Sequence, residues 1–172
     1  MTNGPRLYVY IMKQDDPKKC TSAKMVRLNL ASPIYRASRL PKGSLILNPY
    51  CQEVLTQLDR DRAERSGILA IDCSWENVGK VFDRGFRGVN RRLPLLLAAN
   101  PTSYSRVTRL SSLEALAASL FIFRFDEKAK QLLSIFKWGT TFYTLNKAPL
   151  KDYRNANSSD EIKKIEREYF ST

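Results

Sequence analysis

The stretch from Arg91 to Leu120 constrains the fold more than any other part of the chain. Its apolar run, Leu95 to Ala99, is short enough for one buried strand, and Asn100-Pro101 ends that strand because proline donates no backbone hydrogen bond. After a polar loop, Ser111-Ser112-Leu113-Glu114 fits a capping box that opens an apolar helix over Leu113 to Phe123. A helix N-terminus beside a strand end can bind an anionic ligand, or it can be an ordinary corner of the fold.

The rest of the chain predicts further strands and then a helical final third. Apolar alternation and β-branched residues predict strands over Arg6 to Lys13, Met25 to Leu30, Ser44 to Leu47 and Ile68 to Asp72. Charged or amphipathic segments predict helices over Leu55 to Ser66, Asp126 to Phe136, Thr140 to Tyr153 and Asp160 to Tyr169, with Asp126 as the N-cap of the second. Residues 83–90, DRGFRGVN, read as a loop suited to phosphate and base contacts. The pattern indicates one compact body of the α/β or α+β class.

The absence of histidine from all 172 residues limits the chemistry that the chain can perform. Ser-His-Asp triads and histidine-ligated zinc sites are excluded. Cys20, Cys51 and Cys73 are odd in number and widely spaced, which argues against a disulfide framework. No apolar run reaches the roughly 18 residues of a membrane span, and no segment resembles a signal peptide, so we expect a cytoplasmic protein without a membrane anchor.

The net charge of +12 is concentrated in two segments. Lys13 to Lys42 holds eight Lys or Arg against two Asp, and Lys80 to Leu110 holds seven against one. Each segment therefore carries +6, and the rest of the chain sums to zero. Such clustering favours a polyanionic partner, above all a nucleic acid. The alternative is a solvated basic surface that binds nothing in particular.

The sequence DCSW, from Asp72 to Trp75, follows a predicted buried strand. A carboxylate and a large aromatic ring at the end of a strand are typical of a ligand-binding edge in an α/β sheet. Asp72 or Ser74 could equally cap a helix over Glu76 to Phe82, since caps are common at such positions.

Several short motifs stand in one order: DPKKCTSAK, the NP after Leu47, DCSW, LPLLLAANPTSYSRVTRLSSLEALAA and FKWGTTFYTLN. Through them, from about Tyr8 to Tyr153, the chain resembles the S-adenosylmethionine-dependent aminocarboxypropyltransferases of small-subunit ribosomal RNA, in a compact archaeal form. That family transfers the 3-amino-3-carboxypropyl group to N3 of a pseudouridine-derived base. The resemblance implies an α/β fold with a SPOUT-like sheet and a C-terminal trefoil knot. It also implies a smaller basic N-terminal lobe over residues 1–70, before a cofactor-binding domain with a helical C-terminus over residues 71–172.

The resemblance also implies the residues that hold the cofactor, S-adenosylmethionine. Thr21 and Ser112 would meet its amino acid end. The backbone at Ile71 would hold the ribose, and Leu93 and Thr108 would contact the adenine through main-chain groups. No metal is expected, because the sulfonium already carries the charge of the leaving group.

The chemistry requires the enzyme to select one of three carbons bonded to the sulfonium sulfur. Trp75 is our candidate for the wall that covers the methyl group, with Val78 beside it. Asp72 is our candidate for the group that accepts the proton of uracil N3 or orients the base. The released product would be 5′-methylthioadenosine.

The partner implied is small-subunit ribosomal RNA or a pre-ribosomal subunit, bound by a monomer. The predicted RNA contacts lie in the two basic segments, and they are Lys18, Lys19, Lys24, Arg84, Arg87, Arg91 and Arg92. Two alternatives stay open. One is a SPOUT-type RNA methyltransferase with the same cofactor, and the other is a ribosome-assembly factor that binds ribosomal RNA without chemistry.

Overall fold

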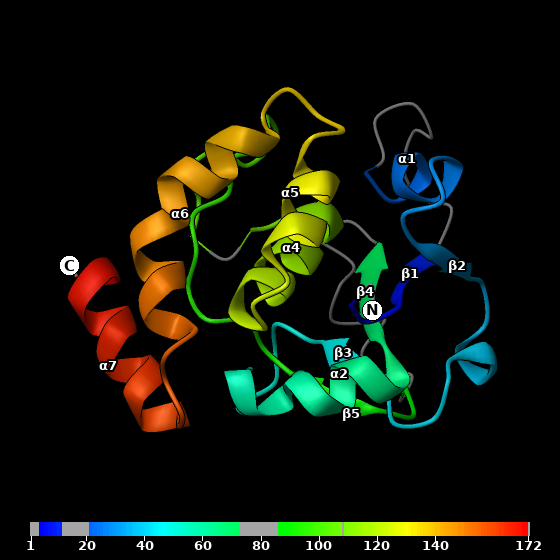
Figure 1. The fold of residues 1–172 in the computed structure, drawn as a ribbon, viewed down its shortest axis with the longest axis horizontal. Helices are drawn as coiled ribbons and strands as arrows, with labels where there is room; N and C mark the ends of the chain where they lie inside the picture. Colours follow the sequence, from blue (N-terminus) through cyan, green and yellow to red (C-terminus); the bar gives the residue numbers. More distant parts are fainter. Residues whose placement is uncertain (1–3, 12–20, 73–85, 108, 172) are drawn as a thin grey trace.

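The computed structural model describes residues 4–11, 21–72, 86–107 and 109–171. Within them, five parallel strands form one sheet in the order β2-β1-β4-β3-β5 (Figure 1). The strands are β1 Leu7–Ile11, β2 Ser32–Ile34, β3 Leu45–Leu47, β4 Ile68–Asp72 and β5 Val89–Arg91. A parallel sheet with helices between and beside its strands confirms the α/β class.

The long helices lie in the second half of the chain. The helices in the described ranges are α1 Thr21–Arg27, α2 Arg60–Ser66, α4 Ser112–Ile122, α5 Asp126–Leu133, α6 Gly139–Tyr153 and α7 Ser159–Phe170, with short 3-10 turns at Ala37–Arg39 and Gln57–Asp59. Helix α4 packs on β4, α1, α5 and α6, so it is the central helix that its apolar sequence predicts. Figure 1 shows α7 and α1 at opposite ends of the long axis. None of the helices in the described ranges is long and apolar enough to cross a bilayer.

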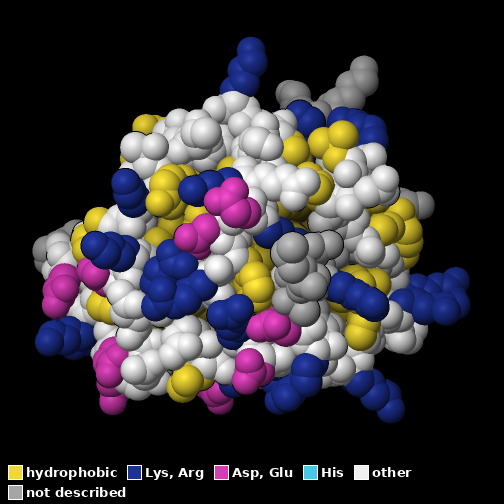
Figure 2. Space-filling view, in the orientation of Figure 1, with side chains coloured by type: hydrophobic (Ala, Val, Ile, Leu, Met, Phe, Trp, Pro, Cys, Tyr) yellow, Lys and Arg dark blue, Asp and Glu magenta, His cyan; other side chains and the backbone are white. Residues whose placement is uncertain are grey.

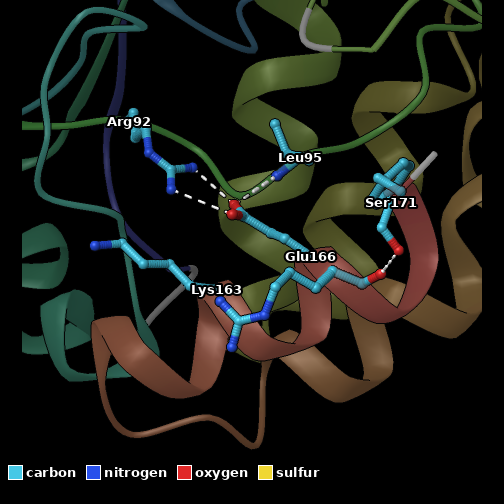
Figure 3. A pocket seen from close by; sticks show the side chains of 7 residues that line it. Arg92, Leu95, Lys163, Glu166 and Ser171 are labelled. Atoms are coloured by element: carbon cyan, nitrogen blue, oxygen red, sulfur yellow. Dashed lines mark hydrogen bonds and ion pairs between the residues drawn. The ribbon is translucent and has the colours of Figure 1, made fainter.

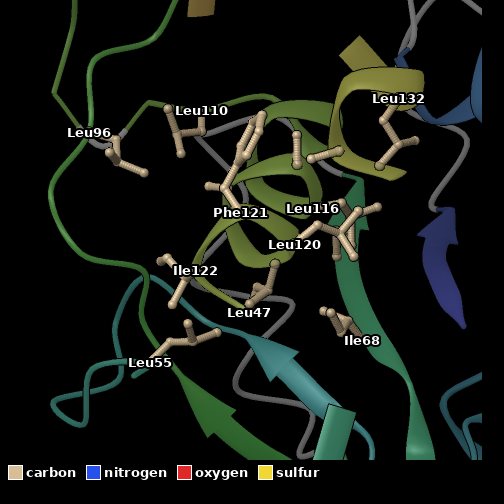
Figure 4. Close-up of a cluster of buried hydrophobic side chains, with 14 of the residues drawn as sticks. Leu47, Leu55, Ile68, Leu96, Leu110, Leu116, Leu120, Phe121, Ile122 and Leu132 are labelled. Atoms are coloured by element: carbon tan, nitrogen blue, oxygen red, sulfur yellow. The ribbon is translucent and has the colours of Figure 1, made fainter. Parts of the chain in front are cut away.

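Both faces of the sheet are buried. Successive side chains of a strand point to opposite faces, so each strand contributes to two apolar clusters. On one face Leu7, Val9 and Ile68 join the main core, where α4 contributes Leu116 and other side chains (Figure 4). On the other face Tyr8, Tyr10, Ile46 and Leu69 form a smaller cluster that includes Phe86. The Tyr10 and Phe86 rings meet edge to face with 5.0 Å between their centroids.

Two predicted strands are wrong. Residues 25–30 do not form a strand, because α1 runs to Arg27 and buries Met25 one turn after Ser22, while Leu28 is exposed. The strand that follows α1 is β2. Residues 95–99 are extended, but their backbone pairs mainly with side chains. The strand nearest to them in the sequence is β5, which begins inside the segment 83–90 that was predicted as a loop.

The extended segment Arg92–Asn100 runs between α4 on one side and α6 and α7 on the other (Figure 1). The Asn146 amide of α6 accepts from the N–H of Leu97 at 2.8 Å and donates to its carbonyl at 2.8 Å. The Tyr153 hydroxyl donates to the carbonyl of Leu95 at 2.8 Å. Burial, and then Glu166, raise the pKa of Tyr153, so the hydroxyl stays a donor. Side chains of the C-terminal helices therefore replace a neighbouring strand.

The predicted helices are largely confirmed, with three corrections. The helix predicted from Leu55 begins at Arg60, after the 3-10 turn Gln57–Asp59. Gly67 ends α2, and Pro149 lies inside α6 without ending it. The helix predicted over residues 126–136 ends at Leu133, and its N-cap is Phe125 instead of Asp126. The Asp126 carboxylate pairs with Arg154, 3.0 Å away, which explains why it does not cap the helix.

The boundary predicted between residues 70 and 71 falls inside β4. β4 pairs with β1 and β3, and β3 pairs with β5, so strands from both sides of that boundary share one sheet. The division into a lobe and a domain stays a prediction.

We expect Gly139→Ala to lower the free energy of unfolding by about 2 kcal/mol. A Cβ at Gly139 would lie 1.8 Å from the Leu133 carbonyl oxygen, so the turn between α5 and α6 would have to move. Urea denaturation measures the loss. Gly43→Ala is a useful comparison, because its Cβ would meet only side chains at 3.4 Å or beyond, so strain at its positive φ would be the main effect. A Gly139→Ala protein as stable as the wild type would contradict this account.

Candidate active site

Three hydroxyl groups from distant parts of the chain meet at the start of two helices. Ser112 Oγ lies 2.9 Å from Thr21 Oγ1 and 2.7 Å from Ser22 Oγ. Ser22 is fully buried, whereas Thr21 and Ser112 are half-buried. The two hydrogen bonds of this hydroxyl cluster use two of its three hydroxyl protons, and the third can be donated to a ligand oxygen. The structure therefore brings together two of the residues predicted to hold the cofactor.

The start of α4 is fixed by the predicted capping box. Ser111 Oγ accepts from the N–H of Glu114, whose carboxylate accepts from the N–H of Ser111 at 3.0 Å. The same carboxylate, fully buried, also accepts from the N–H of Ala99 at 2.6 Å, the N–H of Asn100 at 3.3 Å and Asn100 Nδ2 at 2.6 Å. Glu114 thus ties the end of the extended segment to the helix that presents Ser112.

Ile71, Asp72 and Leu93 lie at or just after the carboxyl ends of β4 and β5, at one edge of the sheet. Asp72 ends β4 opposite Ile11 of β1, and the chain reaches Thr21 after β1. Ile71 precedes Asp72, and Leu93 follows β5. Because β3 separates β4 from β5, Ile71 and Leu93 lie roughly 10 Å apart across the sheet. That span suits a nucleoside lying along the strand ends.

Other predicted site residues lie outside the described residues, namely Trp75, Thr108, Lys18, Lys19 and Arg84, as do Val78 and the side chain of Asp72. The carbonyl of Leu93 accepts from the Arg92 guanidinium at 3.1 Å. Within the described ranges, no three side chains among Cys, Asp and Glu gather as a metal site would require.

Three of the predicted RNA-binding residues already have partners within the protein. Lys24 Nζ donates to the carbonyl of Ile135 at 2.5 Å and lies 4.4 Å from the centre of the Phe136 ring. Arg91 pairs with Glu53 at 2.9 Å, and Arg92 pairs with Glu166 at 2.7 Å. Arg87 is exposed. These contacts leave the charged groups of Lys24, Arg91 and Arg92 less available to RNA than the sequence suggested.

The Arg92–Glu166 pair forms the floor of a hollow beside α7, lined also by Leu95 and Lys163 (Figure 3). Glu166 accepts from Nη1 and Nη2 of Arg92 and from the N–H of Leu95 at 3.2 Å. The carboxylate is thereby occupied in holding α7 against the extended segment. The hollow lies at the end of the molecule away from α1, so it is separate from the hydroxyl cluster.

Sequence reasoning missed Ser22 and the second role of Glu114. Ser22 follows Thr21 directly in the motif CTS. Both residues lie at the N-terminus of α1, so a helix predicted to begin at Thr21 would have placed the two hydroxyls together. The further bonds of Glu114 join it to residues 99 and 100, and nothing in the spacing of SSLE indicates them.

The comparisons with known proteins agree with the fold and with these motifs. The family model described as "Ribosome biogenesis protein, C-terminal" matches residues 45–170. A second model, "Possible Fer4-like domain in RNase L inhibitor", matches residues 5–34. That short segment contains a single cysteine, Cys20, whereas a four-iron cluster takes four thiolates.

Relatives match nearly the whole chain. The 16S rRNA aminocarboxypropyltransferase of Methanocaldococcus jannaschii is 41% identical over 170 residues, which cover 98% of each chain. That of Sulfurisphaera tokodaii is 44% identical over 163 residues, which cover 95% of this chain and 94% of the relative.

A solved structure, that of the SAM-dependent rRNA:acp-transferase Tsr3 from Vulcanisaeta distributa, matches with a TM-score of 0.87. Its sequence is 36% identical, and the match covers 97% of both chains. The resemblance drawn from the motifs is confirmed, and the chain belongs to the family of the 16S rRNA aminocarboxypropyltransferases.

Proposed function

We propose that the protein transfers the 3-amino-3-carboxypropyl group of S-adenosylmethionine to N3 of a pseudouridine, or of its N1-methyl form, in small-subunit ribosomal RNA. The observation that carries the proposal is the contact of Thr21 with Ser112, 91 positions apart in the chain. These are the two residues at which the family resemblance puts the amino acid end of the cofactor. The names of the relatives support the same reaction.

The described residues fit the cofactor. The hydroxyl cluster offers a proton to a carboxylate, and the N-terminus of α4 adds the positive end of a helix dipole. Main-chain groups at Ile71 and Leu93 lie along the same sheet edge, where the ribose and the adenine would sit. When bound, S-adenosylmethionine supplies a sulfonium-activated carbon as the electrophile.

The residues of the chain would then position the reactants. Trp75, with Val78 beside it, would cover the methyl group and leave the γ-carbon of the amino acid side chain exposed to the base. Thr108 would contact the adenine through its main chain. Asp72, at the end of β4, would accept the proton of N3 or orient the base. Histidine is absent from the sequence, so a carboxylate is the natural candidate for this proton transfer.

Three further features belong to the proposal. A SPOUT-like trefoil knot would form where the extended segment Arg92–Asn100 runs between α4 and α6. The bonds of Asn146 and Tyr153 from α6, and of Glu166 from α7, support this arrangement. Residues 1–70 would act as a basic lobe that helps to bind RNA. The protein would work as a monomer in the cytoplasm, on ribosomal RNA or a pre-ribosomal subunit.

The reaction is tested with small-subunit ribosomal RNA from cells that lack the protein. The RNA is incubated with the enzyme and with S-adenosylmethionine labelled either in the carboxyl group or in the methyl group. We expect the carboxyl label in RNA and the methyl label in 5′-methylthioadenosine. The methyl label in RNA would favour the methyltransferase alternative. Neither label in RNA, with RNA still bound, would favour the assembly factor.

A further inference from the structure

We propose that the loop of residues 100–107 and the nearby Arg109 bind a single-stranded stretch of the RNA substrate. Tyr104 would stack on an unpaired base, and the guanidinium groups of Arg106 and Arg109 would bind phosphates. The inference rests on the proposed function, because it requires RNA as the substrate. It assigns the contact to residues outside the set that the sequence singled out.

This loop, called the Tyr104 loop below, is closed at its base by backbone hydrogen bonds. The N–H of Ala98 donates to the carbonyl of Arg106 at 3.0 Å, and the N–H of Ser105 donates to the carbonyl of Ala98 at 2.6 Å. Leu97 and Val107 form an antiparallel bridge just outside these bonds. Inside the loop, the N–H of Ser103 donates to Asn100 Oδ1 at 3.0 Å. A loop braced in this way loses little conformational entropy when it binds a ligand.

The Tyr104 loop presents an aromatic ring beside cationic groups. The Tyr104 side chain is 56% exposed, although it lies on an ordered loop. Arg106 and Arg109 are exposed as well, and neither forms an ion pair with a carboxylate in the described part of the chain. Proteins that bind single-stranded nucleic acid combine these features, because every base has a face that can stack and every nucleotide has a phosphate.

Arg91 and Arg92, which the sequence predicted to bind RNA, make a weaker case. Arg91 and Arg92 are held in ion pairs, and Figure 2 shows acidic side chains among the basic ones on the face in view. A guanidinium that is already paired gains little from a phosphate, since it must first lose its carboxylate partner. Arg106 and Arg109 have no carboxylate partner among the described residues, so a phosphate would displace none there.

The position of the Tyr104 loop also favours a contact with the RNA substrate. Asn100 Nδ2 donates to the carbonyl of Arg109 at 3.3 Å and to the Glu114 carboxylate at 2.6 Å. Through Asn100, the backbone of Arg109 is linked to the buried carboxylate that fixes the start of α4, and Arg109 lies three positions before Ser112. A strand held by Tyr104 and Arg109 would lead toward the hydroxyl cluster, where the cofactor is proposed to bind.

The proposal is tested with the full chain and two fluorescein-labelled RNAs. One is a hairpin whose single-stranded loop carries pseudouridine, and the other is a fully paired duplex of the same length. We expect Tyr104→Ala, and separately the pair Arg106→Gln with Arg109→Gln, to raise the Kd for the hairpin about tenfold at fixed salt, measured by fluorescence anisotropy. Tyr104→Phe keeps the ring and is expected to stay close to the wild type. The arginine pair is also expected to lower the slope of log Kd against log salt by about 1.4.

A matched control removes the same charge elsewhere. Lys163→Gln with Arg167→Gln takes two exposed cations from α7, and the Kd for the hairpin is expected to change much less. S-adenosylmethionine binding, followed by calorimetry, should be the same in all variants. Any of three results would overturn the proposal: an equal rise in Kd for the α7 pair, an unchanged Kd in the loop variants, or tighter binding of the wild type to the duplex than to the hairpin.

The loop assignment and the proposed function can fail separately. If the wild type transfers the aminocarboxypropyl group and the loop variants match it in RNA binding, only the loop assignment fails. If the wild type binds no RNA, the proposed function fails too.

Discussion

Replacing Glu114 with alanine is expected to lower the free energy of unfolding by roughly 4–5 kcal/mol, the largest effect of any substitution considered. The carboxylate is fully buried and accepts from the N–H groups of Ala99, Asn100 and Ser111 and from the Asn100 amide. Alanine would leave these four donors without their acceptor. A buried donor without a partner costs about 1–3 kcal/mol, and some water entry would offset part of the sum.

The measurement is urea denaturation of the variant beside the matched change Glu127→Ala. Glu127 is also in the first turn of a helix, but its side chain is 95% exposed and it lies 4.0 Å from Lys130. We expect the control to change stability by less than about 0.5 kcal/mol. A loss of under about 1 kcal/mol in Glu114→Ala would show that these hydrogen bonds contribute little to stability.

The second large effect is expected at Asn146, where leucine should lower the free energy of unfolding by roughly 3–4 kcal/mol. Leucine is close to asparagine in size, but it cannot bond to the N–H and the carbonyl of Leu97. Both backbone groups would be left inside the protein without partners, and asparagine is fully buried here. The bond to the carbonyl of Phe142 would also be lost.

Hydrogen exchange gives this prediction a local readout. The amide of Leu97 should exchange much faster in Asn146→Leu than in the wild type, whereas amides of β1 and β4 should change only as far as global stability does. Asn155→Ala, at the exposed end of α6, is the matched control and should leave the Leu97 amide protected. Wild-type protection of Leu97 in Asn146→Leu would mean that another group satisfies its backbone.

Local signals in the sequence predicted the elements that depend on local interactions. The capping box Ser111–Glu114, the end of α2 at Gly67 and the strands β1, β3 and β4 all follow from neighbouring residues. The extended segment was predicted as a strand because its apolar run has the right length. The hydrogen-bond partners of this segment are side chains about 50 to 70 positions later in the chain. The spacing of apolar residues within the segment does not indicate such distant partners.

In the candidate site, too, some features could be predicted from the sequence and others could not. The contact of Thr21 with Ser112 could be expected only from the family resemblance, since 91 positions separate them. One missed residue did leave a signal. Asn146 lies on the face of α6 that also carries Phe142 and Leu150, and a polar residue in an apolar stripe indicates a buried hydrogen bond. The ion pairs of Arg91 and Arg92 left none, because their partners come from other elements.

The order in which the ribosome synthesises the chain affects when the candidate active site can form. Residues 92–100 leave the ribosome well before Asn146, Tyr153 and Glu166, which hold them in the folded protein. Until those helices arrive, the N–H and carbonyl groups of Leu95 and Leu97 lack their side-chain partners, and only residues nearer in the sequence hold the segment. Contacts of such wide sequence separation form slowly, because the chain must first close a long loop. We therefore expect the β-sheet to be complete before the site is, so that the nascent chain acquires its fold earlier than its ability to bind a ligand.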